Sequence, residues 1–221
     1  MKNKIPTLIV LVIIYILLKH FIPYGNYVVY PINLIVTFLH EFGHAFFALI
    51  TGGDVKWLVV RSDWSWVTTT AWWIRDLVVA WWYLGSAIFW NILLYIWFTS
   101  TTSNPSLVSR GTNLSKWVLY FLSFLMIFVA IFWFNWIISS LIILALAWGL
   151  FALAKYSKYD SLILQFLWIS SIIFIIEDFN VWPSSDLKAF SGILPESIWM
   201  IVWLVIVILM TLFNLRLIFK K

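Results

Sequence analysis

Hydrophobic and polar positions alternate along this chain in long blocks rather than with a short period. Crossing about 30 Å of hydrocarbon takes roughly 20 apolar residues in an α-helix. Seven apolar runs of about this length are separated by short polar breaks, so the pattern predicts transmembrane helices. The expected spans are residues 5–22, 28–51, 77–99, 117–134, 136–154, 161–177 and 197–217.

The apolar stretch from residue 117 to residue 154 is too long for one of these spans. A single helix of that length would be ~57 Å long, well beyond the thickness of a bilayer core. We therefore predict a helical hairpin that turns tightly at Phe134 and Asn135.

Two segments between the expected spans are polar. Residues 100–116 are expected to form a long loop. Residues 55–70 are rich in β-branched residues and predict two short strands that turn near residues 62–65. The edges of such a hairpin cannot face lipid, so it must lie against protein or at the interface. The predicted fold class is an all-α polytopic membrane protein with six to seven transmembrane helices and a small membrane-associated β-hairpin, in a single domain over residues 1–221.

The composition supports a bilayer environment and excludes several classes of protein. Apolar residues make up 64% of the chain and charged residues only 10%, whereas a soluble domain has about a quarter of its residues charged. The absence of cysteine excludes disulfides and thiolate metal ligands. The net charge of +5 comes from basic residues scattered between apolar runs, which favours membrane flanks over a nucleic-acid surface.

One motif places ionisable residues inside an expected span. Two of the three histidines stand four residues apart with a glutamate between them, in His40-Glu41-Phe42-Gly43-His44. Positions i and i+4 of a helix share a face, so both imidazoles can reach one zinc ion and Glu41 can activate a water on that ion. Ionisable groups within a span are costly and usually functional. The motif therefore favours a zinc site over an interhelical hydrogen-bond cluster.

A catalytic zinc has three protein ligands and one open position, so a third ligand must come from elsewhere in the chain. Asp178 and Asp186 are the leading candidates, with Glu177 close by. Pro183 and the two serines after it predict a helix start that favours Asp186 over Asp178. The third histidine, His20, ends the first span and is expected at the interface. Four further aspartates are expected to be solvated: Asp54, Asp63, Asp76 and Asp160.

In their order along the chain, these residues resemble the site-2 protease family of intramembrane zinc metalloproteases, in its compact branch without a PDZ domain. The motif that ends in His44-Ala45 is similar to that family's HExGHA. The strand pair follows, then Tyr83-Leu-Gly-Ser-Ala-Ile-Phe-Trp-Asn91 resembles a small-residue helix of the family, and Pro183-Ser-Ser-Asp-Leu187 resembles the segment that carries its third zinc ligand. The resemblance implies that His40, His44 and Asp186 bind Zn²⁺, that Glu41 is the general base and that Asn91 contacts the substrate.

The motif and the resemblance together predict an intramembrane zinc metalloendopeptidase. It would cleave membrane-anchored proteins in regulated intramembrane proteolysis, with zinc-bound water activated by Glu41. The expected partners are transmembrane protein substrates and the lipid bilayer, with no nucleic acid, and the expected location is the inner (plasma) membrane of a prokaryotic cell. An extended substrate is expected to lie along an edge of the strand pair. The alternative is a catalytically inactive relative that acts as a membrane scaffold or chaperone.

Tryptophan is unusually frequent and glycine unusually rare, with 17 and 8 residues respectively. With glycine in place of two tryptophans, residues 63–66 would read Asp-Gly-Ser-Gly, which is a far better hairpin turn. Some bacterial lineages read the codon UGA as glycine, whereas a common alternative code reads it as tryptophan. We hypothesise that several tryptophans are glycines in the cell. They are Trp64, Trp66, Trp72, Trp73, Trp81, Trp82, Trp90 and Trp182.

The coding DNA tests this hypothesis directly. We expect UGA at those eight positions, and UGG at Trp117 and Trp199, which fit an aromatic belt at the membrane surface and serve as internal controls. UGG at the eight positions would contradict the hypothesis.

Overall fold

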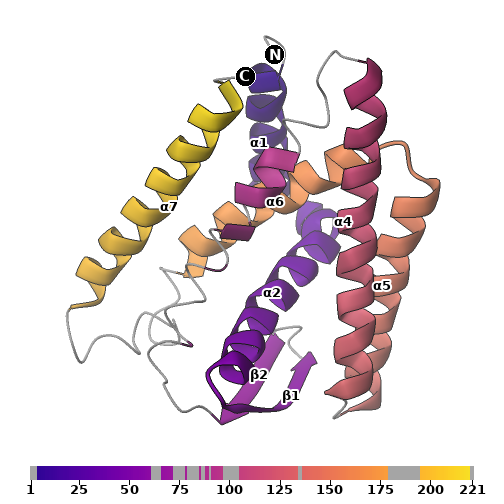
Figure 1. The fold of residues 1–221 in the computed structure, drawn as a ribbon, viewed down its shortest axis with the longest axis vertical. Helices are drawn as coiled ribbons and strands as arrows, with labels where there is room; N and C mark the ends of the chain where they lie inside the picture. Colours follow the sequence, from indigo (N-terminus) through magenta and orange to yellow (C-terminus); the bar gives the residue numbers. More distant parts are fainter. Residues whose placement is uncertain are drawn as a thin grey trace.

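A computed structural model describes residues 4–60, 66–71, 78, 85, 88–89, 91–96, 105–133, 136–178 and 195–219 (Figure 1). The elements bounded within these ranges are α1 (Lys4–His20), α2 (Gly25–Ile50), β1 (Asp54–Val60), β2 (Trp66–Ala71), α4 (Pro105–Phe132), α5 (Ile137–Tyr156), α6 (Asp160–Asp178) and α7 (Glu196–Phe219). Residues 91–96 are also helical. The predicted fold class is confirmed, because the chain is mainly helical with one small antiparallel sheet.

The helix bounds agree closely with the apolar runs of the sequence. The expected spans other than 77–99 and 117–134 match α1, α2, α5, α6 and α7 within three residues at each end. Of the span 77–99, the structure describes residues 78, 85, 88–89 and 91–96, which are helical. Of the eight tryptophans that we expect to be glycine, only the backbone of Trp66 is described, and the other seven lie outside the described residues.

The long loop expected at residues 100–116 is wrong over its second part, because α4 begins at Pro105. Proline suits the first turn of a helix, where its missing N–H would have no partner in the helix in any case. The polar residues that follow it therefore extend the helix instead of ending it.

The chain is an integral membrane protein. By length and composition, four described helices can cross a bilayer, namely Gly25–Ile50, Leu114–Phe132, Ile137–Tyr156 and Ser197–Arg216. The distribution of side chains agrees, because large apolar residues such as Trp148 are exposed while serines such as Ser123 and Ser170 are buried. Apolar surface outside and hydrogen-bonding groups between the helices is the arrangement that lipid favours.

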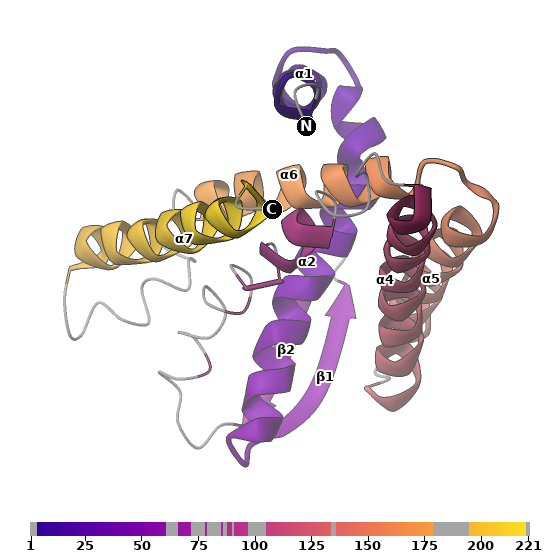
Figure 2. The same cartoon turned by 45° about the horizontal axis from the view of Figure 1, so that its top comes forward.

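Helices α4 and α5 form the predicted helical hairpin and lie side by side in both ribbon views (Figures 1 and 2). α4 ends at Phe132 and α5 begins at Ile137, and the predicted turn residues, Phe134 and Asn135, lie outside the described residues. The Ser123 hydroxyl of α4 donates to the Ala147 carbonyl of α5 over 2.7 Å. This bond satisfies a buried hydroxyl that lipid would leave unpaired.

The two strands form the predicted hairpin and pack along the C-terminal part of α2 (Figure 2). They pair antiparallel, with Leu58 opposite Thr68 and Val60 opposite Trp66. A register shift between Val55 and Trp57 leaves Lys56 as an extra residue on β1. The sheet is therefore held against the transmembrane helix that carries the His40–His44 motif.

A buried hydrogen-bond network joins α1, α2 and α6. The Tyr15 hydroxyl of α1 donates to Asn33 Oδ1 of α2 over 2.6 Å. Ser170 of α6 donates to the same oxygen over 2.7 Å and lies 3.0 Å from the Tyr15 hydroxyl. At the end of the same helices, Lys19 Nζ pairs with Glu177 Oε2 over 2.5 Å. Polar contacts between distant segments thus set how α6 lies against α2.

Replacing Tyr15 by phenylalanine removes one hydroxyl from this network and leaves the ring in place. We expect Tyr15→Phe to lower the free energy of unfolding by about 0.5–1.5 kcal/mol, the usual size of a hydrogen bond between membrane helices. Steric trapping or unfolding in mixed micelles measures it. Tyr27→Phe, at a tyrosine that is 75% exposed, is the matched control. Equal stabilities of the two variants would contradict a stabilising role for the network.

Candidate metal centre

His40 and His44 project from one face of α2 and are both buried, with 6% and 9% of their surface exposed. Their rings meet edge to face, with centroids 5.0 Å apart. This closeness follows from the i, i+4 spacing on a regular helix. One nitrogen of each ring can therefore approach a shared ion.

Glu41 lies beside this pair, and its carboxylate is held by the neighbouring strand. The Thr68 backbone N–H of β2 donates to Glu41 Oε2 over 2.8 Å. The Thr68 hydroxyl donates to the Glu41 main-chain carbonyl over 3.0 Å. The other carboxylate oxygen, Oε1, lies 3.8 Å from His40 Nε2. The two oxygens of Glu41 thus have different surroundings, one facing the sheet and one facing a histidine.

Aromatic side chains pack against two residues of the motif. The Phe174 ring of α6 packs edge-on against His40, with centroids 5.4 Å apart. Phe42 contacts Trp133 at the end of α4, with ring centroids 6.1 Å apart. A Cβ added at Gly43 would meet no described atom outside its own helix within 4 Å. One apolar ring thus packs against His40 and another against Phe42, with space beside Gly43.

The residues present fit a zinc ion in their chemistry. Imidazole nitrogens and carboxylate oxygens are common zinc ligands, and the Nδ1 atoms of both histidines are buried. Two histidines are one ligand short of a catalytic zinc site. Within the part of the chain that the structure describes, no group of three or more His, Asp or Glu side chains is arranged to hold a metal. Asp186, the predicted third ligand, lies outside the described residues.

A comparison with known families adds to this geometry. The family model described as Peptidase M50B-like, which represents site-2 proteases, matches residues 7–214. The chain belongs to the site-2 protease family. The match runs through the motif on α2, the strand pair, Asn91 and the segment that contains Asp186. No curated protein and no solved structure matches the chain.

In this site-2 protease family member, the acidic residues considered as ligands have separate surroundings. Glu177 is engaged by Lys19 and lies 3.9 Å from His20 Nε2, which sets it in an ion pair between α1 and α6. Asp178 is the last residue of α6, one helical turn after Phe174. Because Phe174 touches His40, α6 brings the backbone of Asp178 close to the motif, and Asp178 remains an alternative to Asp186.

Two of the aspartates expected to be solvated are described. Asp54 is exposed at the start of β1, where a hydrogen bond from Lys56 holds the pKa of its carboxyl below the usual value. The expectation is wrong for Asp160, which is only 3% exposed. Asp160 begins α6, and the positive end of a helix favours a carboxylate there. The packing of α6 into the bundle, which its sequence position alone does not predict, buries it.

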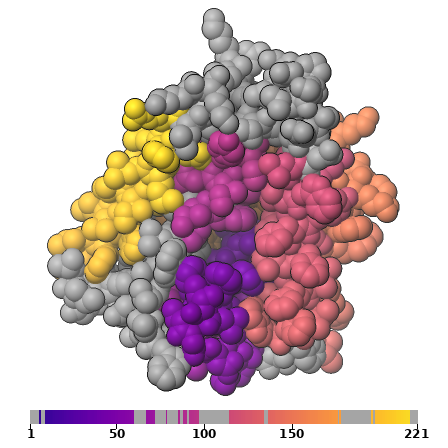
Figure 3. Space-filling model, in the orientation of Figure 1, coloured from indigo at the N-terminus to yellow at the C-terminus, as the bar shows by residue number. Residues whose placement is uncertain are grey.

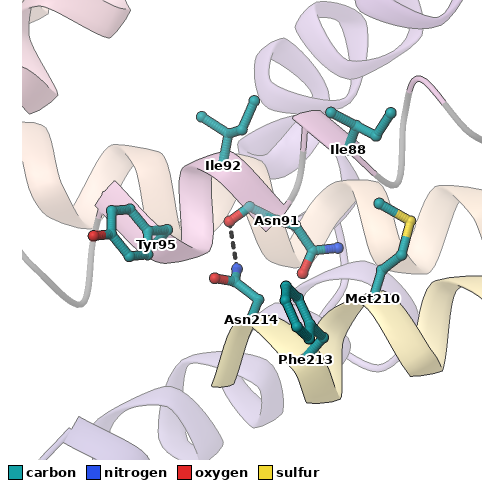
Figure 4. A pocket seen from close by; sticks show the side chains of 7 residues that line it. All are labelled: Ile88, Asn91, Ile92, Tyr95, Met210, Phe213 and Asn214. Carbon is teal, nitrogen blue, oxygen red and sulfur yellow. Dashed lines mark hydrogen bonds between the residues drawn. The ribbon is translucent and has the colours of Figure 1, made fainter. Parts of the chain in front are cut away.

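Asn91, the predicted substrate contact, lies in the wall of a cavity of about 340 Å³ (Figure 4). In the space-filling view, the segment that contains residues 91–96 lies between α7 and α4 (Figure 3). The Asn214 side chain of α7 donates to the Asn91 backbone carbonyl over 2.6 Å. The remaining lining is largely apolar: Ile88, Ile92, Tyr95, Met210 and Phe213. Asn91 thus takes part in a contact between helices, and its role toward a substrate stays a prediction.

Proposed function

We propose that this site-2 protease family member is an intramembrane zinc metalloendopeptidase that cleaves membrane-anchored proteins. The observation that carries the proposal is the group of His40, Glu41 and His44 on α2. The two histidines are buried side by side, and the carboxylate between them is held in place by β2. The chain belongs to a family of metalloproteases. Ionisable groups inside a membrane helix are energetically costly and usually have a function.

His40 and His44 would hold the zinc ion together with Asp186, or with Asp178 as the alternative third ligand. When bound, zinc polarises a peptide carbonyl and makes water a nucleophile at neutral pH. Imidazole and carboxylate donors suit this ion, and the chain has no cysteine to compete with them. The aromatic ring of Phe174 keeps one side of His40 apolar.

Glu41 would act as the general base. Its Oε1 faces His40, so a water held near the histidines lies within reach of this oxygen. Glu41 would take a proton from that water as it attacks the substrate carbonyl, and would then pass the proton to the leaving amine. Its carboxylate is largely shielded, with 14% of the side chain exposed. Shielding from bulk water strengthens the electrostatic contacts of the reacting groups.

The substrate would be a transmembrane segment that unwinds locally, because a peptide bond in a helix is covered by its own hydrogen bonds. An extended strand of substrate can pair with a sheet edge. The N–H of Thr68 is already donated to Glu41, so β2 cannot offer that group to a substrate. We therefore assign the docking edge to β1, which pairs with β2 on its other side.

Replacing Glu41 by glutamine separates a protease from an inactive scaffold. We expect Glu41→Gln to keep its zinc and to lower kcat by about 10²–10⁴-fold, the usual contribution of a general base. The measurement is cleavage of a model transmembrane substrate in proteoliposomes, with zinc content by elemental analysis. The chain is expressed with the residues that its native codons specify. Asp54→Asn, at an exposed carboxylate, is the matched control.

A scaffold or chaperone gives a different result in the same assay. The wild-type chain would then show no cleavage above that of Glu41→Gln, whatever its zinc content. That outcome would refute the proposed protease.

The third ligand is tested by zinc affinity rather than by turnover. We expect Asp186→Asn to weaken zinc binding by at least about 100-fold, because a protein ligand is lost, while Asp178→Asn keeps near-normal affinity. Competition with a chelator measures both. The reverse order would assign the ligand to Asp178, and unchanged affinity in both variants would refute a carboxylate ligand from this region.

A further inference from the structure

Thr68 of β2 makes two contacts with one residue of the motif on α2. Its backbone N–H donates to Glu41 Oε2 over 2.8 Å, and its hydroxyl donates to the Glu41 carbonyl over 3.0 Å. The two residues are 27 positions apart in sequence. β2 thus forms hydrogen bonds to both the carboxylate and the main-chain carbonyl of Glu41.

The backbone donor of Thr68 is one that the sheet does not use. In an antiparallel pair, the N–H groups of alternate residues point away from the partner strand. Thr68 stands opposite Leu58 of β1, yet its N–H reaches Glu41 on α2. The contact to the carboxylate therefore takes an outward-facing donor of β2 and leaves the pairing of the two strands intact.

The contact also gives the carboxylate a direction. With Oε2 fixed to the strand, Oε1 is the oxygen that faces His40, at 3.8 Å from its Nε2. A glutamate side chain has several rotatable bonds, and a general base works only from one orientation. A hydrogen bond to one oxygen selects an orientation and leaves the other oxygen available to receive a proton.

We propose that Thr68 is the positioning residue of Glu41, so that the hairpin sets the orientation of the general base. This inference rests on the proposed protease function. It assigns to β2 a role separate from substrate docking, because β2 acts on the catalytic residue through a backbone amide and a hydroxyl. Thr68 itself touches neither the metal nor the substrate in this role.

The first test separates the two donors of Thr68. Thr68→Val keeps the N–H and the branched shape but removes the hydroxyl, and Thr68→Pro removes both donors. Loss of a group that orients a functional residue typically lowers activity about 10–100-fold. We expect Thr68→Val to lower kcat about tenfold and Thr68→Pro about 100-fold, with KM and zinc content within about twofold of wild type. Thr68→Ser keeps both donors and should restore kcat.

Thr70→Val is the matched control, since Thr70 lies two residues further along the same strand opposite Val55. A folded, zinc-loaded Thr68→Pro variant with wild-type kcat would overturn the proposal, because it lacks the N–H that holds the Glu41 carboxylate. So would a fall in kcat matched by an equal rise in KM or by loss of zinc, because those changes indicate a structural or docking role. If Thr68→Pro does not fold, the hydrogen-exchange test on the Thr68 amide decides the question.

A second test needs neither zinc nor turnover. In the metal-free protein, Glu41→Ala removes the acceptor of the Thr68 N–H, so we expect hydrogen exchange at that amide to become at least about tenfold faster. The amides of Val67 and Thr69 alternate with it along β2 and should keep their rates. An unchanged rate at Thr68 would overturn the proposal.

The outcomes of these tests distinguish the positioning role of Thr68 from the protease function on which it rests. A wild-type chain that cleaves nothing refutes the protease, and the positioning role falls with it. A wild-type chain that needs Glu41 for cleavage but tolerates Thr68→Pro refutes the positioning role alone.

Discussion

The interior of a bilayer contains no water to solvate polar groups, and this constraint governs how the chain is built. Each buried hydroxyl or amide needs a partner from within the protein. Ser123 of α4 meets the Ala147 carbonyl of α5, and Ser170 of α6 meets the Asn33 side chain of α2. Large apolar residues such as Trp148 face outward in turn. The polar groups thus decide which helices lie together, because in lipid the apolar faces are nearly equivalent.

Helix α2 is the element on which these contacts converge. Asn33 joins it to α1 and α6 through the buried network. Two helical turns further on, His40 contacts Phe174 of the same α6. Glu41 follows and is held by β2. One continuous helix therefore links the polar network in the bundle to the His40–His44 motif, so that the position of α6 and the position of the histidines are set by the same packing.

The same constraint accounts for the position of the strand hairpin against α2. A two-stranded sheet is marginal by itself and has open edges. Here its strands lie on α2, with Leu58 buried at 1% exposure. The outward N–H of Thr68 is satisfied by a carboxylate. A backbone donor that would otherwise lack a partner at a sheet edge is thereby paired with an acidic side chain that would itself be costly in a membrane.

The sequence by itself was enough for much of this protein. The lengths of its apolar runs predict the helices, because the thickness of the bilayer sets their length. The spacing of His40 and His44 predicts that they share one face of a helix, since that relation is local and the geometry of the helix fixes it. Contacts between residues distant in sequence cannot be predicted from such local relations. The link from Thr68 to Glu41, the Tyr15–Asn33–Ser170 network and the burial of Asp160 depend on how whole elements pack. Many packings satisfy the same local pattern, and only the tertiary structure decides which polar groups meet.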